Sequence, residues 1–289
     1  MESIWEESLY DLIVRTSTDI PLDVEDAIRC ASKREEEGSN ARSALDMMLD
    51  NIALARQSRR PICQDTGALL FWVEAPFGLR RTTFQNAVES AIVRATEEGV
   101  LRKNCVDTLT GRNTGDNLGA GSPVVHWRET EAAEVTVSLV LKGGGCENVG
   151  MQYSLPDTDL DAGRDLDGVR ACVLDAVFRA QGRGCAPGIL GVAVGGDRAT
   201  GYAESKKQLL RPLGVRSNEP ELASLEARIL EEANTLGIGP MGFGGETTVL
   251  DVLIGQRTRI PASYFVSVSY MCWACRRRMV RLALDGAML

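Results

Sequence analysis

The segment Glu134-Val-Thr-Val-Ser-Leu-Val-Leu-Lys-Gly-Gly-Gly145 carries the clearest fold signal in the chain. Val135, Val137, Leu139 and Leu141 stand at every second position and therefore share one face, which is the period-two pattern of a β-strand. The strand runs directly into three glycines, where the backbone can turn tightly. A strand that ends in a glycine loop is typical of α/β proteins, which commonly bind ligands at strand ends.

The same combination of strands, glycines and helices recurs on both sides of this segment. One helix is expected over residues 219–236, with Asn218 as its N-cap, Glu221 completing a capping-box-like pair and Gly237 as its terminator. Further elements are expected from hydrophobic periodicity: strands at residues 68–73, 189–194, 247–254 and 264–270, and a helix around residues 169–177.

The first sixty residues have helical periodicity instead. Helices are expected from residue 4 to 13, from Pro21 to Glu37, and after a Ser39-Asn40 cap. The predicted fold class is therefore α/β, with a helical N-terminal region (1–60) followed by alternating strands and helices with glycine-rich loops (61–289). Because no repeat or linker divides the sequence, a single domain over residues 1–289 is expected.

Composition favours a soluble, folded chain. Hydrophobic residues make up 44% and charged residues 25% of the 289, and the formal net charge is −8. The acidic start and the lack of an apolar run of roughly 20 residues predict neither a secretory signal nor a membrane helix, so a cytoplasmic location is expected. The negative charge argues against nucleic acid as a partner. The run Arg276-Arg277-Arg278 is interpreted as a solvated helix face or a subunit contact.

Eight cysteines in a chain with cytosolic character point to metal binding, catalysis or burial rather than to disulfides. Cys172 and Cys30 lie in helical segments and are interpreted as small buried hydrophobic residues. Cys272 and Cys275 form a C-x-x-C pair, which leaves zinc binding and thiol redox chemistry both open, although no second pair accompanies it. The single histidine, His126, excludes a histidine-rich metal site.

Two glycine-rich motifs have more than one interpretation. Residues 237–242 match G-x-G-x-x-G, but a helix is expected before them and a strand after them, which is the reverse of a dinucleotide-binding unit. A tight loop that approaches other backbone closely is expected there instead. Residues 142–148 follow a strand, and their glycines could present backbone N–H groups to an anion or simply form a turn.

Residues 61–67, Pro-Ile-Cys-Gln-Asp-Thr-Gly, concentrate a thiol, an amide, a carboxylate and a hydroxyl directly before the strand expected at 68–73. This density of functional groups is consistent with a metal site that has an adjacent acid or base. It is also consistent with an ordinary Asx turn.

Taken together and in order, the motifs resemble the α subunit of class I fumarases and L-tartrate dehydratases, and the resemblance covers nearly the whole chain. The segments that carry it are residues 20–24, 61–67, 113–117, 142–148, 184–188, 206–214 and 236–245.

The resemblance implies an oxygen-sensitive hydro-lyase with a [4Fe–4S] cluster held by Cys63, Cys185 and Cys272. Three protein ligands leave one iron open as a Lewis acid for the hydroxyl of a 2-hydroxy acid. The site residues carried over are Gln64 and Asp65 facing the substrate, Asp65 also as general acid, Arg102 for a carboxylate, and Gly143, Gly144 and Gly145 approaching the bound dianion.

The resemblance also implies a β subunit that supplies the base, in a dimer of αβ units. Fumarate or malate is the leading substrate, with tartrate and mesaconate as alternatives. The chain departs from the family pattern at four positions: Cys146, Ala186, Glu246 and Trp273. These departures keep open a non-catalytic or regulatory paralogue. A zinc or thiol-redox protein built on Cys272 and Cys275 is the other alternative.

Overall fold

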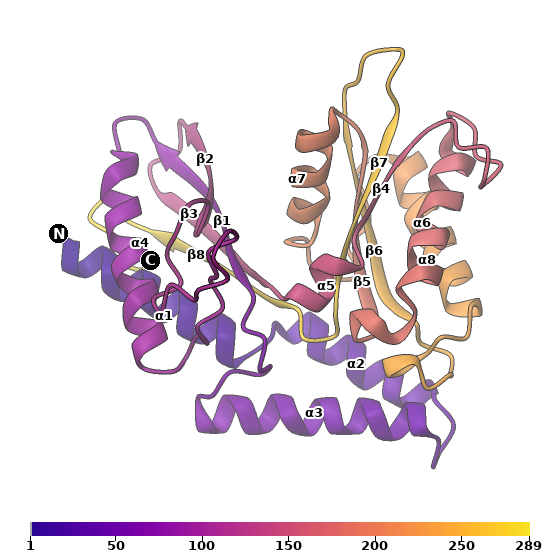
Figure 1. The fold of residues 1–289 in the computed structure, drawn as a ribbon, viewed down its shortest axis with the longest axis horizontal. Helices are drawn as coiled ribbons and strands as arrows, with labels where there is room; N and C mark the ends of the chain where they lie inside the picture. The colour runs from indigo at the N-terminus through magenta and orange to yellow at the C-terminus, as the bar shows by residue number, and fades with distance from the viewer. Residues whose placement is uncertain (1) are drawn as a thin grey trace. The chain divides into compact units, whose positions relative to one another are not determined.

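The computed structural model describes residues 2–289. Its contacts group the chain into two compact units, each assembled from separate stretches of sequence (Figure 1). The first unit comprises residues 1–21, 51–144 and 276–289, and the second comprises residues 22–50 and 145–275. The long helix α3 (Asn40–Ser58) begins in the second unit and ends in the first.

The first unit is a four-stranded sheet with two helices. The strand order is β2-β1-β3-β8, in which β1 and β2 run parallel and the other pairs run antiparallel. Its elements are α1 (Glu2–Thr18), β1 (Ala68–Pro76), α4 (Arg81–Glu97), β2 (Val124–Thr130), β3 (Val135–Lys142) and β8 (Arg276–Leu282).

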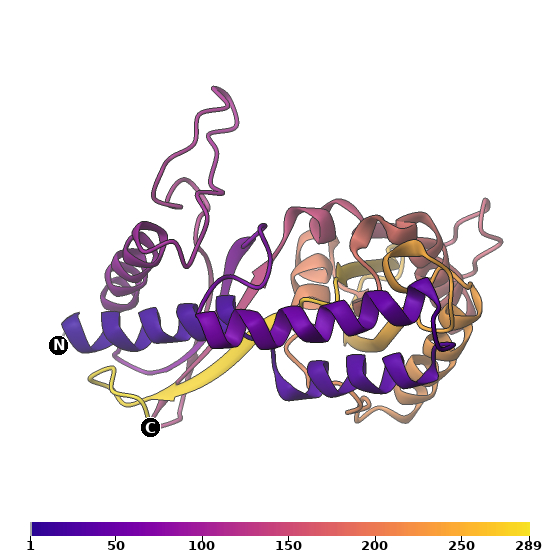
Figure 2. The same ribbon diagram turned by 90° about the horizontal axis from the view of Figure 1, so that it is seen from below.

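The core of the first unit lies between α1, α4 and one face of this sheet. Alternate residues of β1 point into it, among them Phe71, which packs edge-on against Phe84 of α4 at 6.1 Å between ring centroids. The connection between α4 and β2 extends away from the sheet, as Figure 2 shows. Leu109, in this connection, is 94% exposed.

The second unit is a four-stranded sheet covered on both faces, in the order β4-β7-β5-β6. Figure 1 shows α7 on one face and α6 and α8 on the other. All eight residues of β5 are buried, as expected for a strand with helices on both sides. Its elements are α2 (Leu22–Arg34), α5 (Gly144–Asn148), β4 (Met151–Ser154), α6 (Leu166–Ala180), η1 (Gln181–Gly184), β5 (Gly188–Gly195), α7 (Arg198–Gln208), α8 (Pro220–Thr235), η2 (Pro240–Gly242), β6 (Val249–Arg257) and β7 (Phe265–Met271).

The predicted α/β class, the three N-terminal helices and the predicted strands are confirmed. Ser39 caps α3 as expected, since its hydroxyl accepts a hydrogen bond from the Arg42 amide at 3.1 Å. The expected Asn218 cap of α8 is wrong: the helix begins at Pro220, and Glu219 holds the cap position without a side-chain bond. The fixed φ of Pro220 suits the first helical turn and sets that start.

Two further expectations are wrong, namely the helical setting of the arginine run and the burial of Cys30. The arginine run is not a helix face but the start of strand β8, where Arg276 and Arg277 are buried, because β8 pairs with the buried strand β3. Cys30 is exposed on α2, whereas Cys172 is fully buried on α6 as expected. Among the residues described, no helix is long and apolar enough to cross a membrane.

Candidate active site in the first unit and cysteines of the second

The segment before β1 folds around the carboxylate of Asp65. One carboxylate oxygen accepts the Gly67 amide at 3.0 Å, which is the Asx turn anticipated from the sequence, and the other accepts the Gly144 amide at 2.6 Å. Gly67 has φ +80°, and a Cβ there would lie 2.6 Å from the carbonyl of Lys142. The turn is therefore pressed against the end of β3, and only glycine fits at this position.

A second segment, which follows α4, closes around the same turn. The Arg102 amide donates to the Thr66 hydroxyl at 3.0 Å, and the Asn104 side-chain amide lies 3.0 Å from that hydroxyl. Asn117, which is buried, accepts the Asn104 amide at 2.7 Å and donates to the Arg102 carbonyl at 2.8 Å. Asn117 thus fixes the backbone that carries Arg102.

These two segments line a cavity of about 530 Å³ bounded by Gln64, Asp65, Arg102, Lys103 and Asn104. Three of the residues carried over from the resemblance, Gln64, Asp65 and Arg102, therefore share one cavity. It presents a carboxylate, two cationic side chains and two amides, which is a set of groups suited to binding an anion and transferring a proton.

The three glycines of residues 143–145 do not form an open loop. Strand β3 ends at Lys142, and Gly143 connects it to α5, which starts at Gly144. A Cβ on Gly143 would lie 2.9 Å from the Asp65 carboxylate, so its absence lets that carboxylate approach the backbone.

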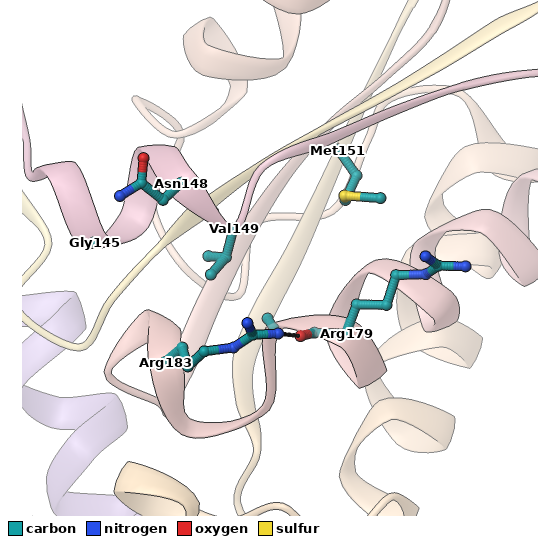
Figure 3. Close-up of a pocket in the computed structure, with 7 residues that line it drawn as sticks. Gly145, Asn148, Val149, Met151, Arg179 and Arg183 are labelled. Atoms are coloured by element: carbon teal, nitrogen blue, oxygen red, sulfur yellow. Dashed lines mark hydrogen bonds between the residues drawn. The ribbon is translucent and has the colours of Figure 1, made fainter.

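Gly145 lines a different cavity, of about 560 Å³, in the second unit (Figure 3). Arg179 and Arg183 supply its positive charge, and Val149 and Met151 supply much of its apolar wall. Arg179 is paired with Asp175 at 2.7 Å, while the Arg183 guanidinium donates to the Arg179 carbonyl. The two guanidinium groups point in different directions in Figure 3.

Arg183, which lines this cavity, lies in η1 just before Cys185. Cys185 follows η1 in a left-handed conformation, with φ 54°, which is uncommon outside glycine. Cys272 follows β7, and the Trp273 amide donates to the Cys185 carbonyl at 3.4 Å. These contacts bring the two predicted ligand segments of this unit side by side.

The buried Tyr270 hydroxyl interacts electrostatically with three thiols of this unit. Burial raises the pKa of the Tyr270 hydroxyl, and the thiols raise it further. They belong to Cys272, Cys146 and Cys185. The Cys146 sulfur also accepts the Cys272 amide at 3.3 Å.

The cysteine chemistry fits an iron–sulfur cluster, which takes thiolates as its ligands. Cys185 and Cys272 lie on adjoining segments of the second unit, and Cys63 lies half-buried in the turn of the first. Within residues 2–289, no group of three or more His, Cys, Asp and Glu side chains is arranged to hold a single metal ion. Cys275, the other member of the C-x-x-C pair, is completely buried.

The loop that contains Glu246, one of the departures from the family pattern, is held by hydrogen bonds to Glu35. The buried carboxylate of Glu35, just after α2, accepts the amides of Glu246 and Thr247 at 2.9 to 3.1 Å. The Glu246 side chain itself is exposed. Gly239 confirms the expected close approach in the preceding loop, since a Cβ there would lie 1.7 Å from the Gly244 carbonyl oxygen.

Two residues that shape the Asp65 cavity, Thr66 and Asn117, are not distinguished by the sequence alone. Both were inside motifs that carried the resemblance, but no local pattern distinguished them. A buried Asn that bonds several backbone groups leaves no periodic signal, because its partners are distant in the chain.

Comparison with known proteins supports one family throughout. The family profile described as fumarate hydratase (Fumerase) matches residues 6–281. A putative class I fumarate hydratase of Geobacillus stearothermophilus is 50% identical over 286 residues, which cover 98% of this chain but 55% of that protein.

Two subunits from other organisms match over nearly their whole lengths. A putative L(+)-tartrate dehydratase subunit alpha of Methanocaldococcus jannaschii is 32% identical over 92% of this chain and 93% of its own length. The L(+)-tartrate dehydratase subunit alpha of Escherichia coli K12 is 35% identical over 96% of this chain and 91% of its own length. The chain therefore belongs to the fumarate hydratase family and corresponds to its α-subunit portion.

Proposed function

We propose that this chain is the α subunit of an iron–sulfur hydro-lyase that adds water to, or removes it from, a small dicarboxylate, with fumarate and malate as the leading pair. The observation that carries the proposal is the cavity that Asp65 and Arg102 both line. A hydro-lyase needs an acid for the leaving hydroxyl and a cation for the substrate carboxylate, and this cavity offers both.

Asp65 is proposed as the general acid. Its carboxyl group is oriented by two backbone amides, those of Gly67 and Gly144, so it cannot rotate away from the cavity without losing both hydrogen bonds. In the dehydration direction it delivers a proton to the departing hydroxyl, and in hydration it takes a proton from the incoming water.

Arg102 and the glycines are proposed to hold the substrate. The Arg102 guanidinium can grip a carboxylate with two parallel hydrogen bonds, and its backbone is fixed at both sides by Thr66 and Asn117. Gln64 lines the same cavity and offers an amide to the substrate. The backbone of residues 143–145 is proposed to approach the second carboxylate.

Cys63, Cys185 and Cys272 are the residues proposed to hold a [4Fe–4S] cluster. When bound, such a cluster with three protein ligands supplies a Lewis acid for the substrate hydroxyl.

The base is proposed to lie in a partner subunit. Relatives of matching length are named subunit alpha, and the chain spans 55% of the fumarate hydratase from Geobacillus stearothermophilus. A β-type subunit corresponding to the remainder of that protein would complete the site. We further propose a cytoplasmic dimer of αβ units.

The test is anaerobic co-expression with a β-type subunit from the same genome. The purified complex should contain about four irons per α chain and should hydrate fumarate or mesaconate or dehydrate tartrate. Replacing Asp65 by Asn should lower kcat by about 10²- to 10⁴-fold, since a proton donor is lost. Asp107→Asn is the matched control, because Asp107 bonds only within its own exposed loop. A cluster-loaded complex without activity would identify a non-catalytic member instead.

A further inference from the structure

Arg276 is the first residue of β8 and one of the largest fully buried side chains, with 1% of its surface exposed. Within residues 2–289, no carboxylate lies within ion-pair distance of it, and its Nε is buried without a hydrogen-bond partner. Removing an arginine charge from water without pairing it is costly. Such a residue is a poor source of stability, and its position calls for another explanation.

Sheet pairing places Arg276 at the edge where the proposed acid lies. Leu141 of β3 pairs with Arg276 on one side and with Leu69 of β1 on the other. The start of β8, the end of β3 and the start of β1 therefore meet at one edge of the first unit's sheet. The Asp65 turn leads into β1 at that edge, and Gly143 leaves β3 there.

The Arg276 guanidinium donates a hydrogen bond to the main chain of Asp65 and not to its carboxylate. Arg276 Nη1 donates to the Asp65 carbonyl oxygen at 2.6 Å. Nη2 lies 3.5 Å from the point where a Cβ of Gly143 would stand, and the Asp65 carboxylate lies 2.9 Å from the same point. The arginine thus holds the main chain of the turn while the carboxylate stays available to the cavity.

We infer that Arg276 is a positioning residue for Asp65: it fixes the Asp65 carbonyl so that the carboxyl group faces the cavity through its two amide hydrogen bonds. The catalytic meaning of this inference rests on the proposed function of Asp65. The positioning itself is a property of the folded chain and can be measured without turnover.

The first experiment measures hydrogen exchange in the full-length chain. Arg276→Gln should accelerate exchange of the Gly67 and Gly144 amides by roughly tenfold or more, because both depend on a fixed Asp65 carboxylate. Arg276→Lys keeps the charge and one donor, so its acceleration should be smaller. The control is Arg281→Gln on the same strand, where an exposed arginine pairs with Glu134.

Amides of β1, which lies between β2 and β3 in the same sheet, report whether the unit that carries the substitution is folded. If Arg276→Gln unfolds, the comparison of Arg276→Lys with the wild type decides the matter. Exchange at Gly67 and Gly144 that matches the Arg281→Gln control would overturn the inference.

The second experiment uses the complex with its β-type partner. Arg276→Gln should lower kcat by at least about tenfold and leave KM within about twofold, because the acid is displaced while the substrate ligands remain. Arg276→Lys should restore most of kcat. A raised KM with an unchanged kcat would contradict positioning of the acid. Absence of hydro-lyase activity in the wild-type complex would count against the proposed function, while the exchange result would still decide the role of Arg276.

Discussion

At the scale of single residues, burial separates cysteines that look alike in the sequence. Cys30 and Cys172 both lie on helices of the second unit, but Cys30 is exposed on α2 and Cys172 is 0% exposed on α6. Burial raises the pKa of the Cys172 thiol to about 12, with Asp157 and Asp175 adding to the shift. The thiolate is the reactive form of cysteine. Cys172 is therefore unreactive for two reasons: burial keeps reagents away from it, and its raised pKa keeps the thiol protonated.

We therefore expect a thiol-alkylating reagent at pH 8 to modify Cys30 readily and to leave Cys172 unmodified until the chain is unfolded. Peptide mass spectrometry after timed alkylation provides the measurement. Modification of Cys172 at the rate of Cys30 in folded protein would show that the helix does not pack as described.

At the scale of elements, caps and close approaches determine where the helices of the second unit lie. Asp197 starts α7 with a capping box, accepting the amides of Ala199 and Thr200 while the Thr200 hydroxyl accepts the Asp197 amide. The helix then packs directly on β5, because Gly191 has no Cβ; one would lie 2.1 Å from the Ser205 carbonyl oxygen. The cap and the glycine together seat α7 on the sheet.

The stability that the Asp197 cap contributes should depend on pH. Hydrogen bonds from Thr200, and then from Ala199, lower the pKa of the Asp197 carboxyl below its usual value. Its contribution to stability is therefore complete above the unfolded-state pKa of about 3.9 and is lost as the pH falls through the lower folded-state pKa. Asp197→Ala should be less stable than the wild type at pH 7, and the difference should shrink below about pH 4.

Urea unfolding at a series of pH values measures this difference. Asp159, an exposed loop carboxylate of the same unit, provides the control position as Asp159→Ala. A difference for Asp197→Ala that grows on acidification would contradict the assigned sign.

Strands with strong hydrophobic periodicity are predictable from the sequence, whereas strands defined by their tertiary pairing are not. The strand at residues 135–142 alternates clearly and is predicted. Strand β8 was missed because three arginines begin it, and only its pairing with β3 shows that two of them are buried. Strand β2 was missed for a related reason: it is an edge strand whose residues are mostly half-buried, so it lacks a clear apolar face.

At the scale of the whole molecule, the sequence predicts the family and the grouping of Gln64, Asp65 and Arg102 in one site. Each motif is ambiguous by itself, but several motifs in the same order along the chain are specific to the family. The sequence could not predict the supports of that site. Asn117 and Arg276 act through backbone groups 15 and 211 positions away in the sequence, and no local pattern encodes such contacts.

We predict that turnover by this chain depends on its β-type partner subunit. The chain purified alone should have turnover at least about a hundredfold below that of the complex, because the proposed base is absent. Adding the separately purified β-type subunit under anaerobic conditions should restore turnover, measured by absorbance of the unsaturated dicarboxylate. Full activity of the isolated chain would show that its own residues supply the base.

The two units are made of stretches that alternate along the chain, so the first unit cannot be completed until its last stretch has been synthesised. The first unit takes residues from near the N-terminus, from the middle and from 276–289, so its sheet lacks β8 until those residues leave the ribosome. Until then β3 presents an unpaired, apolar edge that could join another nascent chain. Arg276 begins that strand, so its proposed hold on the Asp65 turn can form only after residues 276–282 have left the ribosome.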